Sequence, residues 1–181
     1  MFEHTPWLYK NTPDNKARFV LGEGGTNPLV CIGINPSTAE PNNLDRTLTK
    51  VETFSKKLGF DGWIMFNIYP QRATDPSELH ECCDHYLHEE NQKWIYKYLE
   101  MFPGCTIWAA WGISISKRPY LGNCLESIVN HSIANAHWIT IGELTVNGHP
   151  HHPLYLAYES SVTEFDIKKY LLDVRNYDTL G

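Results

Sequence analysis

The first group of residues with chemical potential is the polar motif Asn35-Pro36-Ser37-Thr38, which follows an apolar segment. An amide and two hydroxyls at such a position can orient a water molecule, or bind a phosphate or the edge of a base. The same residue types also form ordinary turns and helix caps. The motif therefore indicates a binding site or a turn, and residue chemistry alone leaves both open.

A second group is the histidine-rich segment His149-Pro150-His151-His152-Pro153. Histidine titrates near neutral pH, can stabilise a developing anion and can bind a metal. Three histidines in four residues suggest a metal site, but no carboxylate stands beside them to define a coordination geometry. We therefore expect no metal and favour a chemical role for His149 or His152, with a metal-dependent hydrolase as an alternative.

Three further residues follow apolar segments. Asn67 offers a donor and an acceptor that can pair with the edge of a nucleobase, or can satisfy loose backbone groups. Arg72 can hold a phosphate, or can be a surface charge paired with Asp75. Trp111 can stack on a planar ligand, or can belong to the core or to a lid.

The hydrophobic pattern predicts the elements that must position these residues. Four short, nearly continuous apolar runs indicate buried strands, and segments with helical spacing separate them. The four runs are residues 29–34, 63–67, 106–110 and 138–141. Strands that alternate with helices predict the α/β class. We expect a single domain over residues 1–181, a three-layer α/β/α fold with a central, mainly parallel four-stranded sheet.

Ligands of such sheets bind outside the carboxyl ends of the strands. The segments after the four predicted strands are therefore expected to meet at one edge of the sheet, and all four are rich in groups that donate, accept or stack. These segments are residues 35–38, 67–72, 111–112 and 143–153. Outside this core, the pattern predicts a loop over 1–16, a short edge strand over 17–21 and a C-terminal helix over 163–174.

Charge and cysteine content restrict the class of protein. The formal net charge of −6 argues against a general phosphate-binding surface, although a local basic patch is compatible with it. The five cysteines form no C-x-x-C pair and are expected to be reduced, as in a cytoplasmic protein. The chain has no apolar stretch long enough for a membrane span and no secretory signal pattern at its start, so we expect no membrane partner.

The motifs after the strands, in this order, resemble those of the uracil-DNA glycosylase superfamily. Members have a Gly-x-Asn-Pro or Gly-x-Asp-Pro motif, a later strand that ends in a base-reading Asn, often a Trp-Gly pair, and a C-terminal His-Pro-Ser-Pro motif with a catalytic histidine. The matching segments here are residues 33–36, 65–67, 111–112 and 149–153. The last segment has an extra residue between its prolines, so either His149 or His152 matches the family histidine. Ser37 stands where these glycosylases usually have Gly or Tyr.

A closer resemblance is to a bacterial and phage family of unknown function, number 1643. Its hallmarks resemble residues 35–39, Asn67 with residues 72–76, and residues 148–155. The resemblance covers roughly residues 17–156. It bears on the fold more than on any activity, because one fold can serve many functions.

The glycosylase resemblance implies cleavage of an N-glycosidic bond in DNA or in a nucleotide, without a metal or another cofactor. Asn67 would pair with the base edge, and Asn35 would position the attacking water. His149 or His152 would stabilise the charge of the leaving base. The other expected substrate-binding residues are Pro36, Ser37, Thr38, Arg72 and Trp111. In duplex DNA the base must first be flipped out. The alternative is a non-catalytic module that binds a nucleotide or a modified base in the same pocket.

Overall fold

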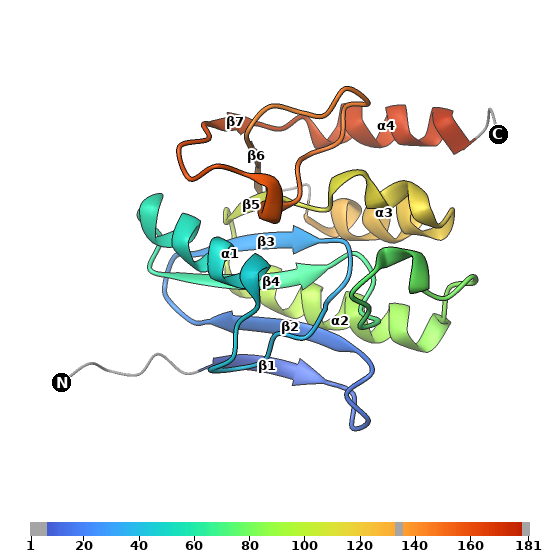
Figure 1. Cartoon of the computed structure of the whole chain (residues 1–181), viewed down its shortest axis with the longest axis horizontal. Helices are drawn as coiled ribbons and strands as arrows, with labels where there is room; N and C mark the ends of the chain where they lie inside the picture. Colours follow the sequence, from blue (N-terminus) through green and yellow to red (C-terminus); the bar gives the residue numbers. More distant parts are fainter. Residues whose placement is uncertain (1–6, 133–135, 179–181) are drawn as a thin grey trace.

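The computed structural model describes residues 7–132 and 136–178, which form a mixed α/β fold around one seven-stranded sheet (Figure 1). The strands are β1 (Trp7–Asn11), β2 (Arg18–Glu23), β3 (Pro28–Gly33), β4 (Gly62–Asn67), β5 (Thr106–Ala109), β6 (His137–Ile141) and β7 (Val162–Glu164). Their order in the sheet is β1-β2-β4-β3-β5-β6-β7. Within the two described ranges, no helix has the length and apolar character needed to cross a membrane.

The sheet mixes parallel and antiparallel pairs. Strands β4, β3, β5 and β6 lie side by side in parallel. Strands β1, β2 and β7 add antiparallel pairs at the two ends. The predicted mainly parallel, four-stranded sheet is therefore wrong for the sheet as a whole, although the α/β class is confirmed. The strand predicted over 17–21 corresponds to β2, which is not at the edge of the sheet because β1 pairs with it. Strand β1 itself lies in the segment predicted to be a loop.

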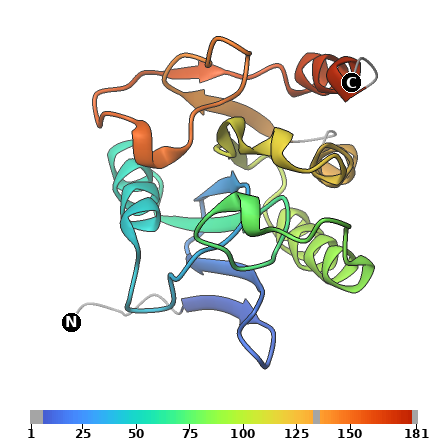
Figure 2. The same ribbon diagram turned by 45° about the vertical axis from the view of Figure 1, so that its right-hand side comes forward.

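Helices cover both faces of this sheet (Figure 2). They are α1 (Arg46–Lys57), α2 (His85–Met101), α3 (Tyr120–Ser132) and α4 (Ile167–Asp178). Leu29 and Cys31 of β3 pack in a buried cluster with α1, whereas Val30 and Ile32 pack in a second cluster with the other three helices. Burial on both faces explains why the sequence of β3 is continuously apolar.

Aspartate side chains cap the N-termini of two helical segments. Asp45 accepts a hydrogen bond from the Leu48 amide at 2.9 Å and so caps α1. Asp75 caps a single 3-10 turn, η1 (Pro76–Glu78). The predicted C-terminal helix begins later than expected because β7 takes its first residues. The predicted absence of a secretory signal concerns residues 1–6, which lie outside the described ranges.

Helix α1 is held against the sheet by Phe54, which is 1% exposed and packs edge-on against Trp108 with ring centroids 5.3 Å apart. We expect Phe54→Ala to lower the free energy of unfolding by about 3–5 kcal/mol, because it removes a buried ring and leaves a cavity. Urea denaturation followed by circular dichroism measures the change. The control Leu172→Ala, at an exposed position of α4, should change it by no more than about 0.5 kcal/mol. Equal losses in both variants would contradict this account of how α1 is anchored.

Candidate functional site

A cavity of about 740 Å³ lies at the carboxyl ends of the parallel strands. Its lining comes from the ends of β3 and β4 with their following loops, the N-terminus of α1, the 3-10 turn η2 (Gly112–Lys117) after β5, and the loop from Thr145 to Tyr155 after β6. Segments that are far apart in the sequence therefore meet at one place, as the strand-end argument predicts.

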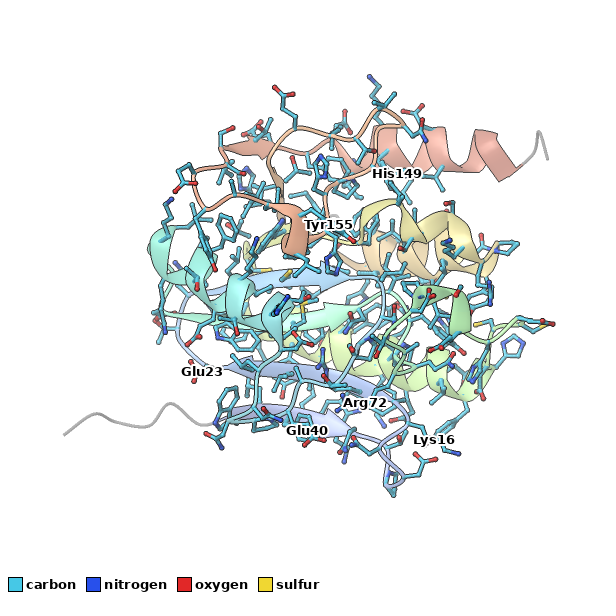
Figure 3. The ribbon with its side chains drawn as sticks, in the orientation of Figure 1. Lys16, Glu23, Glu40, Arg72, His149 and Tyr155 are labelled. Carbon is cyan, nitrogen blue, oxygen red and sulfur yellow. The ribbon has the colours of Figure 1, made fainter. Side chains whose placement is uncertain are left out.

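Five of the predicted site residues line this cavity, namely Asn35, Pro36, Ser37, Asn67 and His152. Four others do not, namely Thr38, Arg72, Trp111 and His149. Figure 3 shows Arg72 on the side of the molecule near Glu40 and the strands β1 and β2, whereas His149 lies close to α4. The structure thus divides the predicted residues into a group that can meet a ligand in the cavity and a group with other contacts.

The side-chain amide of Asn67 is the most unusual polar group of the cavity. Asn67 is 1% exposed, and no described residue is bonded to its Oδ1 or Nδ2. Its main-chain oxygen is held by the Nδ2 of Asn91 in α2, at 2.9 Å. The register of β3 with β4 places Gly33 opposite, and a Cβ on Gly33 would come within 3.0 Å of Oδ1. The missing side chain of Gly33 leaves room for a buried amide that can pair with a ligand.

Asn35 is fixed by two hydrogen bonds to the backbone. Its Nδ2 donates to the carbonyl of Pro36 at 3.0 Å and to that of Ala73 at 2.8 Å. The Ala73 amide in turn donates to the Pro36 carbonyl at 2.9 Å, so the loops after β3 and β4 are joined. Both protons of the Asn35 amide are thereby used, and within the described residues its Oδ1 has no donor. This oxygen can accept a hydrogen bond from a ligand or from water.

His152 presents a ring of defined tautomer. Its Nδ1 accepts the Leu154 amide at 3.2 Å, so the proton of the neutral ring is on Nε2. Burial lowers the pKa of His152 below 6.5, against the opposing effect of the nearby Asp45 carboxylate. The Cβ of His152 lies 3.3 Å from the position that a side chain on Gly112 would take. The loop therefore packs closely on η2, with a neutral hydrogen-bond donor at the cavity.

Three charged residues line the cavity without having been predicted: Arg18, Asp45 and Arg46. Arg18 is 1% exposed, and its Nη1 donates to the Ala39 carbonyl at 3.0 Å. Burial and the nearby Arg72 lower its pKa to about 10, while Asp45 acts in the opposite direction. Asp45 is the single carboxylate among the described lining residues. Its position three residues before Leu48 is typical of a helix cap, so a sequence signal existed, but it indicated a structural role.

Arg72 works as a clamp on the backbone rather than facing the cavity. Its guanidinium donates to the carbonyl of Ser37, to that of Ala39 at 3.3 Å through Nη1, and to the Tyr9 hydroxyl at 3.0 Å. A carboxylate oxygen of Glu40 lies 3.9 Å away, so the expected pairing with Asp75 is replaced by a contact with Glu40. These bonds hold the loop that follows the Asn35 motif.

Trp111 and His149 share a partner in α4. Trp111 is fully buried in the core, and its Nε1 donates to the Tyr170 hydroxyl at 2.9 Å. The Nδ1 of His149 lies 2.8 Å from the same hydroxyl. Both side chains therefore fasten α4 and the histidine loop to the third parallel strand, and neither reaches the cavity lining.

Among the described residues, the three loop histidines do not form a cluster of closely spaced candidate metal ligands. His149 is bonded to Tyr170, whereas the Nδ1 of His152 is used by the Leu154 amide. In the part of the chain that the structure describes, the one group of three closely spaced candidate metal ligands lies elsewhere, at Cys83, His88 and Cys124. The geometry of the histidine loop thus offers no support for a metal-dependent hydrolase.

We expect Arg72→Ala to lower the free energy of unfolding by about 1.5–3 kcal/mol, because it removes charge-assisted hydrogen bonds to partly buried carbonyls. Tyr9→Phe, which deletes a single one of these bonds, should cost about 0.5–1.5 kcal/mol. Urea denaturation measures both changes. Unchanged stability of Arg72→Ala, together with lost binding of an anionic ligand, would instead favour the phosphate-holding role.

The pKa of His152 predicts a pH dependence of stability. Because burial lowers this pKa in the folded state, the unfolded chain takes up the proton first as the pH falls below 6.5, and stability is lost through the folded-state pKa. His152→Asn keeps an acceptor for the Leu154 amide and removes the titration. We expect a smaller loss of unfolding free energy between about pH 7.5 and about pH 5 in this variant than in the wild type. Equal losses would show that His152 does not contribute.

Comparison with known proteins identifies a family for this chain. Residues 18–154 match the model of a family described as "Protein of unknown function (DUF1643)". The match begins at Arg18 and ends at Leu154, both of which line the cavity. No curated protein and no solved structure matches the chain, and these comparisons give no support to the resemblance to uracil-DNA glycosylases. The matched segment spans most of the sequence, and the chain belongs to this family of proteins of unknown function.

Proposed function

We propose that the cavity binds a nucleobase-containing ligand and that the protein hydrolyses the N-glycosidic bond of this ligand. The observation that carries the proposal is the buried amide of Asn67, whose Oδ1 and Nδ2 have no described partner. A buried polar group without a partner costs about 1–3 kcal/mol. The edge of a nucleobase offers an acceptor next to a donor, which is complementary to the two atoms of an amide. Binding such an edge satisfies both atoms of Asn67 at once.

In this proposal, His152 helps the base to leave. When the bond between sugar and base breaks, the electron pair of the bond stays on the base, whose oxygens become more negative. The Nε2–H of the neutral His152 ring donates a hydrogen bond to such an oxygen and stabilises the developing charge. A lowered pKa suits this role, because the ring stays neutral near pH 7 and keeps this donor in place without adding charge.

The attacking water is positioned by oxygens at the cavity wall. Asn35 Oδ1 and the Asp45 oxygen that does not cap α1 both have no described donor. They accept hydrogen bonds from a water whose oxygen attacks the anomeric carbon. As the new C–O bond forms, the water proton passes to the Asp45 carboxylate, the stronger base of the two. Asp45 is thus added to the predicted catalytic residues.

The charge of the lining favours a ligand that carries phosphate. Arg18 and Arg46 outnumber the single carboxylate of Asp45, so the cavity is locally positive on a protein of net charge −6. A few local cations are enough for one nucleotide or for one flipped residue of a DNA strand. Both substrate classes are therefore included in the test.

We expect the purified protein to release free base from single-stranded or duplex DNA containing uracil or modified pyrimidines, or from the corresponding nucleotides, as measured by chromatography. His152→Asn should lower kcat by about 10²–10³-fold, the typical cost of losing one donor to a developing anion. The matched control His149→Asn, in the same loop but outside the cavity lining, should keep the activity. Loss in His149→Asn with full activity in His152→Asn would reverse the assignment. Binding without any product would replace hydrolysis by a non-catalytic binding module.

The variant Asn67→Leu tests the role of this amide in ligand binding separately from its role in folding. Replacing the unpartnered amide by an apolar side chain of similar size should leave the unfolding midpoint of the free protein unchanged or raise it, because the burial penalty disappears. The same variant should lose the thermal stabilisation that nucleotides give to the wild type. A large drop in stability without ligand would mean that Asn67 has a structural role, and would remove the observation on which the proposed function depends.

A further inference from the structure

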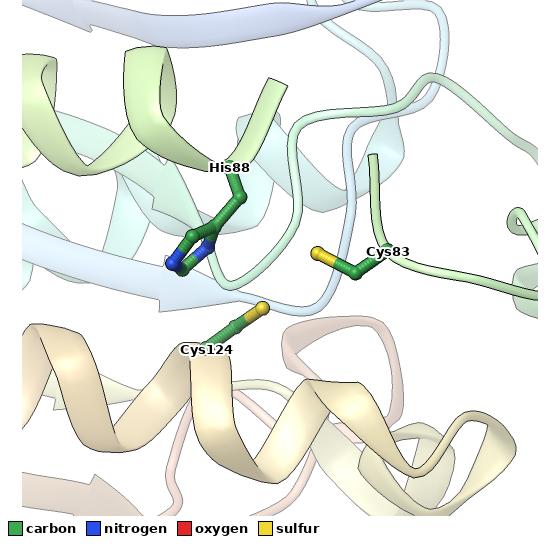
Figure 4. Close-up of side chains that lie close together, drawn as sticks. All are labelled: Cys83, His88 and Cys124. Atoms are coloured by element: carbon green, nitrogen blue, oxygen red, sulfur yellow. The ribbon is translucent and has the colours of Figure 1, made fainter. Parts of the chain in front are cut away.

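A second cluster of chemically reactive side chains lies on the opposite face of the sheet from α1. Cys83 precedes α2, His88 lies in the first turns of α2, and Cys124 lies in α3. Figure 4 shows the two thiols and the imidazole pointing into one common space between these helices. One potential ligand atom from each residue lies within 4.8 Å of the other two. None of the three residues lines the cavity described above.

The chemistry of this cluster is that of a soft metal site. Two sulfurs and one imidazole nitrogen are the donor set that Zn²⁺ and similar thiophilic cations prefer, and three protein ligands leave one tetrahedral position for water or a small ligand. Cys83 and His88 are half-buried whereas Cys124 is buried, so an ion can enter from one side.

His88 supplies an independent observation. Its Nδ1 is buried and has no described hydrogen-bond partner. An imidazole nitrogen that packing deprives of both water and a protein partner is stabilised by coordination, because the metal takes the place of the missing hydrogen bond.

We propose that Cys83, His88 and Cys124 bind one thiophilic divalent cation, with Zn²⁺ as the reference ion, in a site that links α2 to α3. Each thiol gives its proton to solvent as its sulfur bonds to the metal, so no oxidant or reductant is required. The ion joins the loop before α2 to a helix more than thirty residues later in the chain. The bound ion therefore stabilises the position of α2, the helix that also carries Asn91, whose side chain is bonded to the main chain of Asn67.

The test uses the full-length reduced protein and Co²⁺ as a spectroscopic substitute for Zn²⁺. We expect saturation at one ion per chain, with a thiolate-to-cobalt charge-transfer band and the visible bands of tetrahedral cobalt, both of which excess Zn²⁺ removes. Zn²⁺ should raise the unfolding temperature, and a chelator should reverse the rise. Cys83→Ser and His88→Gln should lose the bands and at least about 10-fold in zinc affinity, since even changes outside the ligand set cost this much.

Cys82→Ser is the matched control, because Cys82 is the exposed neighbour of Cys83 and is not part of the cluster. It should bind cobalt and zinc like the wild type. Circular dichroism shows whether each variant is folded, and both ligand positions chosen for substitution are half-buried. Absence of saturable binding to the reduced wild type would overturn the proposal. So would equal binding by Cys83→Ser, or an equal loss in Cys82→Ser.

Discussion

The parallel pairing of β3 with β4 is the constraint on which the candidate site depends. It sets Gly33 opposite Asn67, and the pairing continues past the ends of the strands, since the Ile68 amide donates to the Gly33 carbonyl at 2.9 Å. The two following loops must then run side by side. They are joined by the bond from Asn35 Nδ2 to the Ala73 carbonyl and by the bond from the Ala73 amide to the Pro36 carbonyl. The main chain of Asn67 is thereby held in place from both sides, by β3 and by Asn91, and its side chain lies at the cavity.

Buried cations give the site its shape as well as its charge. Arg18 and Arg72 both donate to the Ala39 carbonyl, from β2 and from the loop after β4. Two like charges so close together are unfavourable, which contributes to the lowered pKa of Arg18, and the Asp45 carboxylate offsets part of the cost. An acidic protein thus keeps two of its guanidinium groups inside, where one lines the cavity and the other holds its wall.

Prediction of the fold from the sequence succeeded where burial leaves a strong pattern. The four apolar runs correspond to β3, β4, β5 and β6, because strands covered on both faces need apolar residues at every position. Strands β1 and β7 escaped prediction for the opposite reason, since all three residues of β7 are exposed and β1 is at most half-buried. Such strands are stabilised by backbone pairing with a neighbour, and a pattern of side chains does not reveal that neighbour.

For the site, the sequence by itself determined which segments meet, because strand ends carry Asn35, Asn67 and the histidine loop to one edge of the sheet. Only the tertiary structure decided which side chains face the cavity. Trp111 continues the alternation of β5, so its side chain lies on the face of the sheet that α3 and α4 cover. His149 contacts the Tyr170 hydroxyl of α4 instead of the cavity. Alternation shows which residues share a face, but the contacts of distant helices determine where the cavity lies.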